Sequence, residues 1–478
     1  MSGYLNRMLD FNAPYRLLVD GQLVDTVSRL DVVNPATGEV FASCPAAGAA
    51  ELDAAVRAAR RAHAAWKALS FAERAAFIGR FAAALDAHKE PLARLLTQEQ
   101  GKPVGQSRDE IARAATLSVG MTKIALESEV ILDNAERFIE LRWLPLGVAG
   151  IITPWNAPVN LAAGPLASAL YTGNCAIIKP SPFTPLTTLR IGEILKDVLP
   201  AGVVNVLAGG DELGGMLTSH PGIDKISFTG SVATGKKVMA SCAGTLKRVT
   251  LELGGNDAAI VLPDVDVADV AKKLFFAATV NSGQVCMAVK RIYAHADIHD
   301  ALCAALVDEA RRARLGDGLD PATTLGPIQN RRQFERVCEL REDARAHGHL
   351  EEAGQRAGGG YFVAPAVVTG LAETDRLVAE EQFGPVFPVL KFTDVEDAIA
   401  RANDTRFGLS GSVWSRDLAR ARQIAARLEV GTAWVNQHRI TAATVPFGGA
   451  KESGLGRTYS RMGLEAYLEP QVISVLKS

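Results

Sequence analysis

Cys286 is the side chain of this sequence best suited to attack a carbonyl carbon. It lies in NSGQVCMAVKR, residues 281–291, where Lys290 and Arg291 supply the only charges. Taken alone, a single cysteine among apolar residues is more often a buried hydrophobe than a nucleophile. The polar and glycine residues before it predict a loop leading into the start of a helix, where backbone N–H groups and the helix dipole would stabilise a thiolate.

Two further side chains are suited to assist such a nucleophile. Glu252 ends an apolar strand in TLELGGND, and the two glycines that follow leave its carboxylate placed to act as a general base. Asn156 lies in ITPWNAP, in a turn stiffened by two prolines, where its amide can donate to an oxyanion together with a backbone N–H. Each also has an ordinary alternative: a solvated glutamate, and an asparagine that satisfies turn backbone.

Two motifs predict a ligand that bears phosphate. KPSPFTPLT places Lys179 at the carboxyl end of the strand-like run CAII, at the edge where nucleotides bind in open α/β sheets. FTGSVATG places Gly230, Ser231 and Gly235 at a strand-to-helix turn, where backbone can approach a pyrophosphate. Neither motif is GxGxxG or a P-loop, and each is a weak signal alone.

The elements that must position these side chains form two α/β series. Amphipathic, alanine-rich helices are expected from 50 to 125, with Ser70 as an N-cap and Glu73 three positions later. From 146 onward, short apolar runs such as GVAGIIT, VVNVLAG and FPVLKF alternate with helical segments, which predicts parallel sheets covered on both faces. We therefore predict an α/β fold with two doubly wound parallel-sheet domains and a cleft between them.

The same patterns suggest domain limits. We assign residues 1–125 and 146–251 to a Rossmann-like dinucleotide-binding domain and residues 252–450 to a catalytic domain. ERFIELRWLPLG and the later run QVISVLK are expected to form a small β flap, and both would be exposed edges in a monomer. Residues 126–145 and 465–478 are therefore assigned to an oligomerisation segment, and a homodimer or homotetramer is expected.

Composition argues against several functional classes. The 478 residues include 51 basic and 53 acidic side chains, for a net charge of −2, without a long single-sign block, so nucleic acid is not an expected partner. With no basic leader and no run of about 18 apolar residues, neither a signal peptide nor a membrane span is expected, and the protein is assigned to the cytoplasm. The cysteines and histidines lack the spacing of disulfide frameworks or metal sites, so no metal is expected.

The order and number of the motifs resemble the aldehyde dehydrogenase superfamily, of the NAD(P)-dependent, hydrolytic, non-acylating type. The matching pieces are EQGKP, ITPWN, KPSPFTPLT, FTGS, LELGG, GQVC, EEQFGP and PFGGAKESGLG, so the resemblance is effectively full length. It implies an EC 1.2.1 enzyme that oxidises an aldehyde to a carboxylic acid. Cys286 would form a thiohemiacetal and then a thioester, Asn156 and the Cys286 N–H would hold the oxyanion, and Glu252 would activate the hydrolytic water.

The resemblance also implies where the cofactor and the aldehyde bind. Lys179 is expected at the adenine ribose, Ser231 at the pyrophosphate, and Glu381 with Phe383 at the nicotinamide ribose. The full set of cofactor positions is Ile152, Thr153, Trp155, Lys179, Ser181, Gly209, Phe228, Gly230, Ser231, Leu253, Glu381 and Phe383. The substrate positions are Ala157, Asn160, Gly164, Val285, Met287, His438, Arg439, Thr441 and Phe447.

Two departures from the family pattern affect the cofactor and the hydrolysis step. Pro182 stands where NAD-preferring relatives often have a glutamate, which leaves NADP use open, although NAD is favoured because no extra arginine replaces the acid nearby. Thr458 follows Arg457 where many relatives have an acidic residue, so hydrolysis is expected to depend on Glu252 alone.

A third departure concerns the substrate. Ala157, Gly164 and Thr441 stand where relatives that act on small aliphatic aldehydes often have aromatic rings, which predicts a wider tunnel and a bulky, aromatic or branched aldehyde. His438 and Arg439 lie in the same loop and either meet an anionic or polar tail of the substrate or form a solvated loop pair. Two other functions stay open: a dehydrogenase that passes the thioester to coenzyme A, against which Glu252 argues, and a non-catalytic dinucleotide-binding member of the fold.

Overall fold

The structure, a computed structural model, describes residues 9–354 and 359–477. The described chain begins with two hairpins, β1 (Leu17–Val19) with β2 (Gln22–Val24) and β3 (Arg29–Asn34) with β4 (Glu39–Pro45). Four helices follow: α1 (Ala49–Ala68), α2 (Phe71–Ala87), α3 (Lys89–Gln100) and α4 (Val104–Met121). The predicted cap is confirmed, because Ser70 accepts from the Glu73 N–H while Glu73 accepts from the Ser70 N–H.

The first sheet has eight strands in the order β2-β1-β9-β8-β7-β10-β11-β21. Its five parallel strands are β7 (Val148–Ile152), β8 (Cys175–Lys179), β9 (Val204–Val206), β10 (Lys225–Thr229) and β11 (Arg248–Glu252), and β21 (Gly454–Leu455) pairs antiparallel at the edge. They are linked by α5 (Pro158–Tyr171), α6 (Leu186–Val198), α7 (Asp211–Ser219) and α8 (Val232–Ala243). The strand order reverses between β7 and β10, and this switch point is where open α/β sheets bind ligands.

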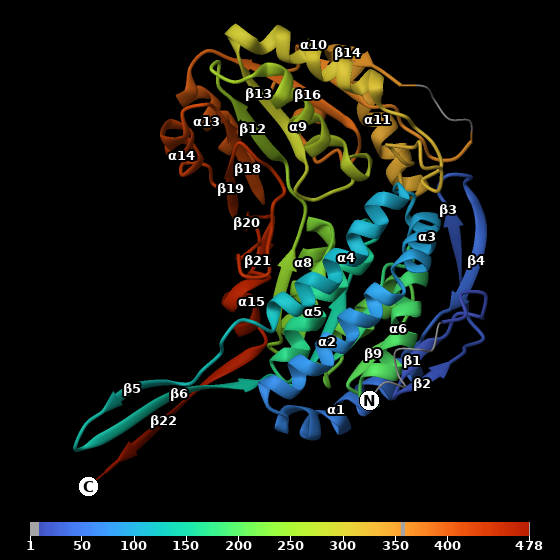
Figure 1. The fold of residues 1–478 in the computed structure, drawn as a ribbon, viewed down its shortest axis with the longest axis vertical. Helices are drawn as coiled ribbons and strands as arrows, with labels where there is room; N and C mark the ends of the chain where they lie inside the picture. The colour runs from blue at the N-terminus through green and yellow to red at the C-terminus, as the bar shows by residue number, and fades with distance from the viewer. Residues whose placement is uncertain (1–8, 355–358, 478) are drawn as a thin grey trace.

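The second sheet has seven strands in the order β14-β15-β16-β13-β12-β18-β19. The parallel strands are β12 (Asp257–Val261), β13 (Val289–His295), β15 (Ala366–Thr369), β16 (Val386–Phe392), β18 (Ser410–Trp414) and β19 (Thr432–Val435), with β14 (His349–Glu352) antiparallel at one edge. Its helices are α9 (Val267–Thr279), α10 (Ala296–Arg312), α11 (Arg331–His347), α12 (Arg376–Ala379), α13 (Val395–Asn403) and α14 (Leu418–Ala425). Figure 1 shows this sheet at one end of the molecule and the first sheet beside it.

A three-stranded antiparallel flap projects from the body of the molecule (Figure 1). It consists of β22 (Leu468–Leu476), β6 (Arg137–Pro145) and β5 (Glu129–Asp133), in that order. The expectation that the first ribbon strand would be an exposed edge is wrong, because β6 is the central strand and is paired along its whole length with β22 of the same chain. The edges are β5 and β22. Short elements complete the fold: β17 (Phe407–Gly408) pairs with β20 (Ala450–Lys451), and α15 (Ser460–Glu465) precedes β22.

The predicted fold class is confirmed, since two mostly parallel sheets are each flanked by helices and accompanied by a small β flap. The proposed domain limits stay a prediction. Within the described residues, no helix has the length and hydrophobicity needed to cross a bilayer.

Candidate active site

The three catalytic candidates come from chain segments of both sheets. Asn156 lies between β7 and α5, and Glu252 is the last residue of β11, so both lie at the carboxyl edge of the first sheet. Cys286 lies between the short 3-10 turn η1 (Val280–Gly283) and β13 of the second sheet. A Cβ placed on Gly255, just after Glu252, would lie 2.8 Å from the Cys286 carbonyl oxygen, so the base and nucleophile segments touch.

The backbone before Cys286 differs from the predicted helix start, and that prediction is wrong. Asn281, Ser282 and Gly283 all have left-handed backbone angles, with φ of 52°, 55° and 75°. Such a run cannot open a right-handed helix, because left-handed conformations bring Cβ too close to the following carbonyl. Instead the chain leads into β13, and Gly283 lies so close to the Gly384 carbonyl oxygen that a Cβ would approach it to 2.2 Å. The nucleophile segment itself therefore begins no helix whose dipole could act on the thiol.

Lys290 makes contacts that fix the position of the nucleophile segment. Its buried Nζ donates to the carbonyl oxygens of Val285 at 3.0 Å and Cys286 at 2.5 Å, and it lies 3.4 Å from a Glu381 carboxylate oxygen. Burial raises the pKa of the Cys286 thiol to about 12, against the opposing charge of Lys290. The thiol is therefore protonated near neutral pH. Lys290 was not among the predicted site residues. A lysine inside an apolar run, four residues after a candidate nucleophile, could have indicated that it contacts the nucleophile segment.

Asn156 joins the two halves of the site. Its side-chain Nδ2 donates to the Gln284 carbonyl oxygen at 2.9 Å, which leaves the second amide N–H for another acceptor. Its own carbonyl oxygen accepts from Lys102 Nζ at 2.7 Å and from Asn281 Nδ2 at 2.9 Å. Lys102 is ion-paired with buried Glu110 at 2.5 Å. Lys102, in the EQGKP motif, and Glu110 are thus positioning residues that the sequence analysis did not assign.

Glu252 is a buried carboxyl group with unused hydrogen-bonding capacity. Neither of its oxygens has a hydrogen-bond partner among the described residues. Burial raises its pKa well above the ordinary value, and Arg457 opposes that shift. A Cβ on Gly448 would lie 2.9 Å from Oε1, so the carboxyl group faces the PFGG segment. A carboxyl group with a raised pKa and unbonded oxygens is suited to exchange a proton with a water or thiol beside it.

The expected cofactor residues of the first sheet gather around its switch point. Ile152 ends β7 and Phe228 lies in β10, while Lys179 ends β8. Burial lowers the pKa of Lys179 to about 8. Ser231 is the N-cap of α8 and accepts from the Thr234 N–H at 3.2 Å, so the first turn of a twelve-residue helix faces this edge. Other expected positions lie in the same segments or beside them: Thr153, Ser181, Gly209, Gly230 and Leu253.

The second sheet supplies the remaining cofactor positions. The rings of Trp155 and Phe383 meet edge to face, with centroids 5.4 Å apart, which links the segment after β7 to the segment before β16. Glu381 accepts from the Gly255 N–H at 3.0 Å, and a Cβ on Gly254 would nearly overlap its carboxylate. These residues fit a nicotinamide dinucleotide, because the buried Thr153 hydroxyl has no hydrogen-bond partner in the described structure and the first turn of α8 begins at the same edge of the sheet.

His438 does not offer a ring nitrogen to a substrate. Its Nε2 lies 3.1 Å from the Met287 carbonyl oxygen and must donate there, while Nδ1 accepts from the Ser412 hydroxyl at 2.9 Å. Burial lowers its pKa to about 3, so the ring is neutral. The carbonyl group that His438 binds belongs to Met287, the residue after Cys286. His438 therefore helps to fix the position of the nucleophile segment.

Ala157, Gly164 and Thr441 carry no aromatic ring, but other side chains occupy part of the space that such rings would fill. A Cβ on Gly164 would lie 2.9 Å from the Tyr459 ring, so that ring already occupies the position beside Gly164. Thr441 accepts hydrogen bonds from Arg113 through both its hydroxyl and its carbonyl oxygen. Ala157 and Asn160 lie at the start of α5, Val285 and Met287 flank Cys286, and Phe447 is buried. Tyr459 and Arg113 were not predicted because they are remote in the sequence from the other substrate positions.

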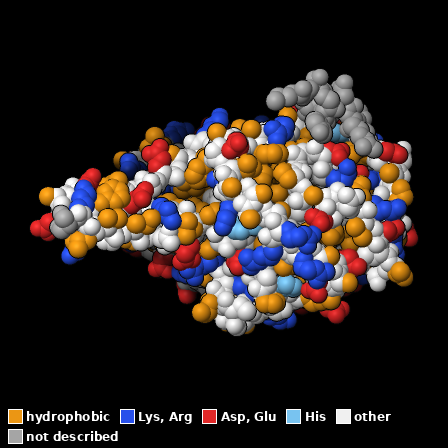
Figure 2. Space-filling model, turned by 90° about the horizontal axis from the view of Figure 1, so that it is seen from below, with side chains coloured by type: hydrophobic (Ala, Val, Ile, Leu, Met, Phe, Trp, Pro, Cys, Tyr) orange, Lys and Arg blue, Asp and Glu red, His pale blue; other side chains and the backbone are white. Residues whose placement is uncertain are grey.

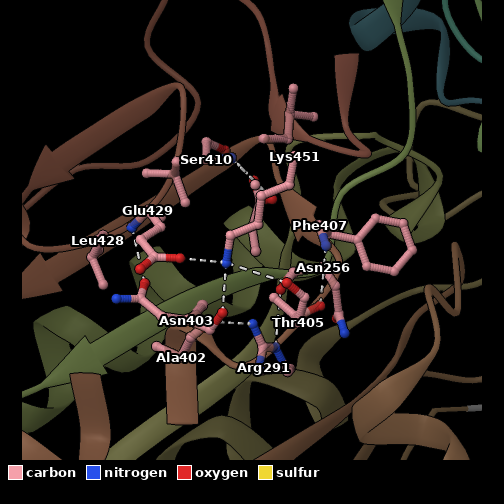
Figure 3. A pocket seen from close by; sticks show the side chains of 16 residues that line it. Asn256, Arg291, Ala402, Asn403, Thr405, Phe407, Ser410, Leu428, Glu429 and Lys451 are labelled. Carbon is pink, nitrogen blue, oxygen red and sulfur yellow. Dashed lines mark hydrogen bonds and ion pairs between the residues drawn. The ribbon is translucent and has the colours of Figure 1, made fainter. Parts of the chain in front are cut away.

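A separate small cavity is lined in part by residues of β12 and β18 (Figure 3). Lys451 crosses it, pairing with Glu429 at 2.7 Å and donating to the Asn403 carbonyl oxygen at 2.6 Å. With about 10 Å³ of space it has room for at most one water, and none of the predicted site residues lines it. In the described part of the chain, no three His, Cys, Asp or Glu side chains gather in a way that would hold a metal ion.

Comparison with known proteins identifies close relatives of the chain. The profile of the aldehyde dehydrogenase family matches residues 23–473. An aldehyde dehydrogenase of a Fusarium species is 38% identical over 449 residues, covering 93% of this chain and 95% of its own. The NAD+ complex of an aldehyde dehydrogenase from Bacillus cereus has 34% identity and a TM-score of 0.95, covering 98% of this chain and 97% of its own. An NADP-dependent enzyme of E. coli has the same identity and TM-score and covers 98% and 100%.

The raised pKa of the Cys286 thiol predicts how it reacts with iodoacetamide. Because the thiolate is the reactive form and the pKa lies near 12, we expect the alkylation rate to rise about tenfold per pH unit between about pH 7 and pH 10. Mass spectrometry of the peptide containing Cys286 measures this rate, and Cys286→Ala identifies the labelled site. A rate that levels off near pH 8 would contradict the raised pKa.

Proposed function

Because the chain belongs to the aldehyde dehydrogenase family, we propose that it oxidises an aldehyde to a carboxylic acid through a thiohemiacetal and a thioester on Cys286. The family's general reaction is the oxidation of an aldehyde with a nicotinamide dinucleotide. The observation that carries the proposal is the junction at Asn156, whose hydrogen bond to the Gln284 carbonyl oxygen holds an amide beside the Cys286 segment. Gly255 brings the Glu252 segment against the Cys286 carbonyl oxygen of the same segment.

The proposed chemistry begins with attack of the Cys286 sulfur on the aldehyde carbon. The thiol is protonated at rest, so its proton leaves as the C–S bond forms, through a water to solvent or to the ionised form of Glu252, which returns it to solvent before the hydrolytic step. The second N–H of the Asn156 amide and the Cys286 backbone N–H donate to the oxygen that gains charge. A bound nicotinamide supplies the hydride acceptor. Glu252 then takes a proton from the water that attacks the thioester, which releases the acid and restores the thiol.

We propose NAD as the preferred cofactor. Lys179, Ser231, Glu381 and Phe383 would hold it, and the neighbouring Trp155 ring would border the same groove. Pro182 lacks the carboxylate that would repel a 2′-phosphate, so NADP is the alternative to be measured beside NAD.

The roles of Cys286 and Glu252 separate in kinetics. Cys286→Ala should abolish reduction of the cofactor, whereas Glu252→Gln should release up to one reduced cofactor per site and then turn over about 10²- to 10⁴-fold more slowly, because thioester hydrolysis loses its base. Stopped-flow absorbance measures both phases. Activity surviving in Cys286→Ala would contradict the mechanism. Release of the Glu252→Gln block by coenzyme A would favour the acylating alternative, and dinucleotide binding without oxidation of any aldehyde would favour a non-catalytic member.

The proposed substrate is a bulky aldehyde, aromatic or branched. Ala157 and Thr441 support this choice because neither presents a ring, whereas the Tyr459 ring beside Gly164 takes back part of the space. We expect kcat/KM for benzaldehyde-type substrates to exceed that for acetaldehyde, with either NAD or NADP. Steady-state kinetics over an aldehyde panel measures it, and a preference for acetaldehyde would overturn the substrate class.

We also propose a cytoplasmic homodimer or homotetramer assembled through the flap. Exposed apolar side chains cover the flap, as the orange patches on the projecting arm in Figure 2 show: Val130, Ile131, Leu132, Leu144, Val472, Val475 and Leu476. Such a surface on a paired but open sheet is typical of subunit contacts.

Charges placed on this surface should weaken assembly. Val472→Lys combined with Val475→Lys is expected to shift the protein to monomer in light scattering after gel filtration, because two lysines would have to be buried in the contact. Val40→Lys, at an exposed apolar position on β4, is the matched control and should leave the assembly intact. A monomeric wild-type protein, or a doubly charged variant that assembles normally, would refute the flap contact.

A further inference from the structure

We propose that Arg113 and Arg439 form a binding site for a carboxylate at the far end of the aldehyde substrate, so that the preferred substrates are aldehydes that carry a second, anionic end. This inference rests on the proposed function and specifies its substrate class.

Hydrogen bonds place two arginines from distant parts of the chain near the nucleophile segment, since Arg113 donates to Thr441, and His438, the residue before Arg439, bonds to the Met287 carbonyl oxygen. Arg113 belongs to α4 and donates to Thr441, two residues after Arg439, in the segment that follows β19. The pKa of Arg439 is lowered to about 10, mainly by burial and also by the charge of Arg113. Cys286 opposes this shift. Burial raises the pKa of Tyr459 to about 12. The charge of Arg113 opposes this rise, whereas the charges of Glu252 and Cys286 add to it. These effects agree with the hydrogen bonds that tie Arg113 to Thr441 and His438 to Met287.

The positive charge of this pair is not balanced within the protein. Among the described residues, neither Arg113 nor Arg439 makes an ion pair, whereas most other arginines near acidic side chains do. Arg439 Nε is buried and has no hydrogen-bond partner in the described structure. Two like charges that are partly withdrawn from water gain free energy when an anion joins them. A carboxylate matches the planar guanidinium fork and would supply the missing acceptors.

Arg439 is also held in a restricted conformation. Its φ of 68° is left-handed, which is uncommon for a residue with a Cβ and gathers at functional sites. The neighbours on both sides are tied down, since His438 bonds to the Met287 carbonyl oxygen and the Ile440 carbonyl oxygen accepts from Trp434 Nε1 at 3.1 Å. The guanidinium lies over the ring of Phe276, which is 59% exposed, so it reaches from the site toward the surface.

This arrangement specifies the shape of the substrate. The aldehyde carbon must reach Cys286, and the anion must reach Arg113 and Arg439. The Tyr459 ring beside Gly164 and the buried Phe447 lie near the site, so apolar atoms are favoured between the two ends of the substrate. An aromatic aldehyde with a carboxylate opposite the carbonyl meets these requirements, and so does a chain of methylene groups ending in a carboxylate.

The first test compares 4-carboxybenzaldehyde with 4-methylbenzaldehyde, which has similar size and no charge. We expect the ratio of their kcat/KM values to favour the carboxylate in the wild-type enzyme. The ratio should fall about 10- to 100-fold in Arg113→Gln and in Arg439→Gln, mostly through KM, because each variant removes a charged hydrogen bond. Arg422→Gln, at an exposed position on α14, is the control and should leave the ratio unchanged. Equal kcat/KM values for the two aldehydes, or a ratio unaffected in both variants, would overturn the proposal.

The second test does not depend on aldehyde oxidation. Iodoacetate and iodoacetamide alkylate the same thiol, and only iodoacetate is an anion. The ratio of their rates at Cys286 should fall at least about tenfold in the Arg113→Gln and Arg439→Gln variants if the pair attracts carboxylates. If no aldehyde is oxidised but this ratio falls, the anion site stands and the proposed function fails. If aldehydes are oxidised and the ratio is unchanged, the function stands and the anion site is refuted.

Discussion

The hydrogen bonds of Asn156 hold together the two sheets at the point where the chemistry is proposed to occur. Its side chain reaches the Gln284 carbonyl oxygen of the second sheet, and its carbonyl oxygen receives Asn281 from the same segment. Lys102 approaches that carbonyl from the N-terminal helical layer and is itself neutralised by buried Glu110. A buried polar junction of this kind favours one geometry, because alternatives leave a charge or an amide unpaired. The spacing of the proposed nucleophile, base and oxyanion donor therefore depends on this junction.

Burial raises the pKa of the acidic groups around the site. Burial raises the pKa of the Cys286 thiol and of Glu252, and it raises the pKa of Asp257 to about 7. The unpaired cations Arg113 and Arg439 lie on the proposed substrate side, and Lys290 lies under the nucleophile. A site whose thiol stays protonated leaves these cations free to pair with the negative charge of a substrate, because no thiolate competes for them.

Sequence reasoning located the elements and the reacting side chains better than their surroundings. Lys179 and Glu252 lie at strand ends as predicted, because buried parallel strands are apolar and the first polar residue marks their carboxyl edge. The left-handed run from Asn281 to Gly283 could not be read from propensity, since it ends where Gly283 packs against Gly384 in a remote segment. The same limit applies to Tyr459, which fills the space beside Gly164 from across the chain, and to His438, whose partners are Ser412 and Met287. The central place of β6 was missed because a strand's neighbours are set by tertiary pairing.

The pairing of β6 with β22 has a consequence for how the protein is made. Arg142 of β6 bonds to Gln471 of β22, and the two residues are 329 positions apart in the chain. At a synthesis rate of roughly 5–20 residues per second, β6 leaves the ribosome roughly 15 to 65 seconds before its partner exists. During that interval the edge of β6 that later pairs with β22 has no partner. A neighbouring nascent chain on the same messenger RNA presents an identical strand. Escape from mispairing therefore depends on timing, and the flap can be completed only after both sheets have been synthesised.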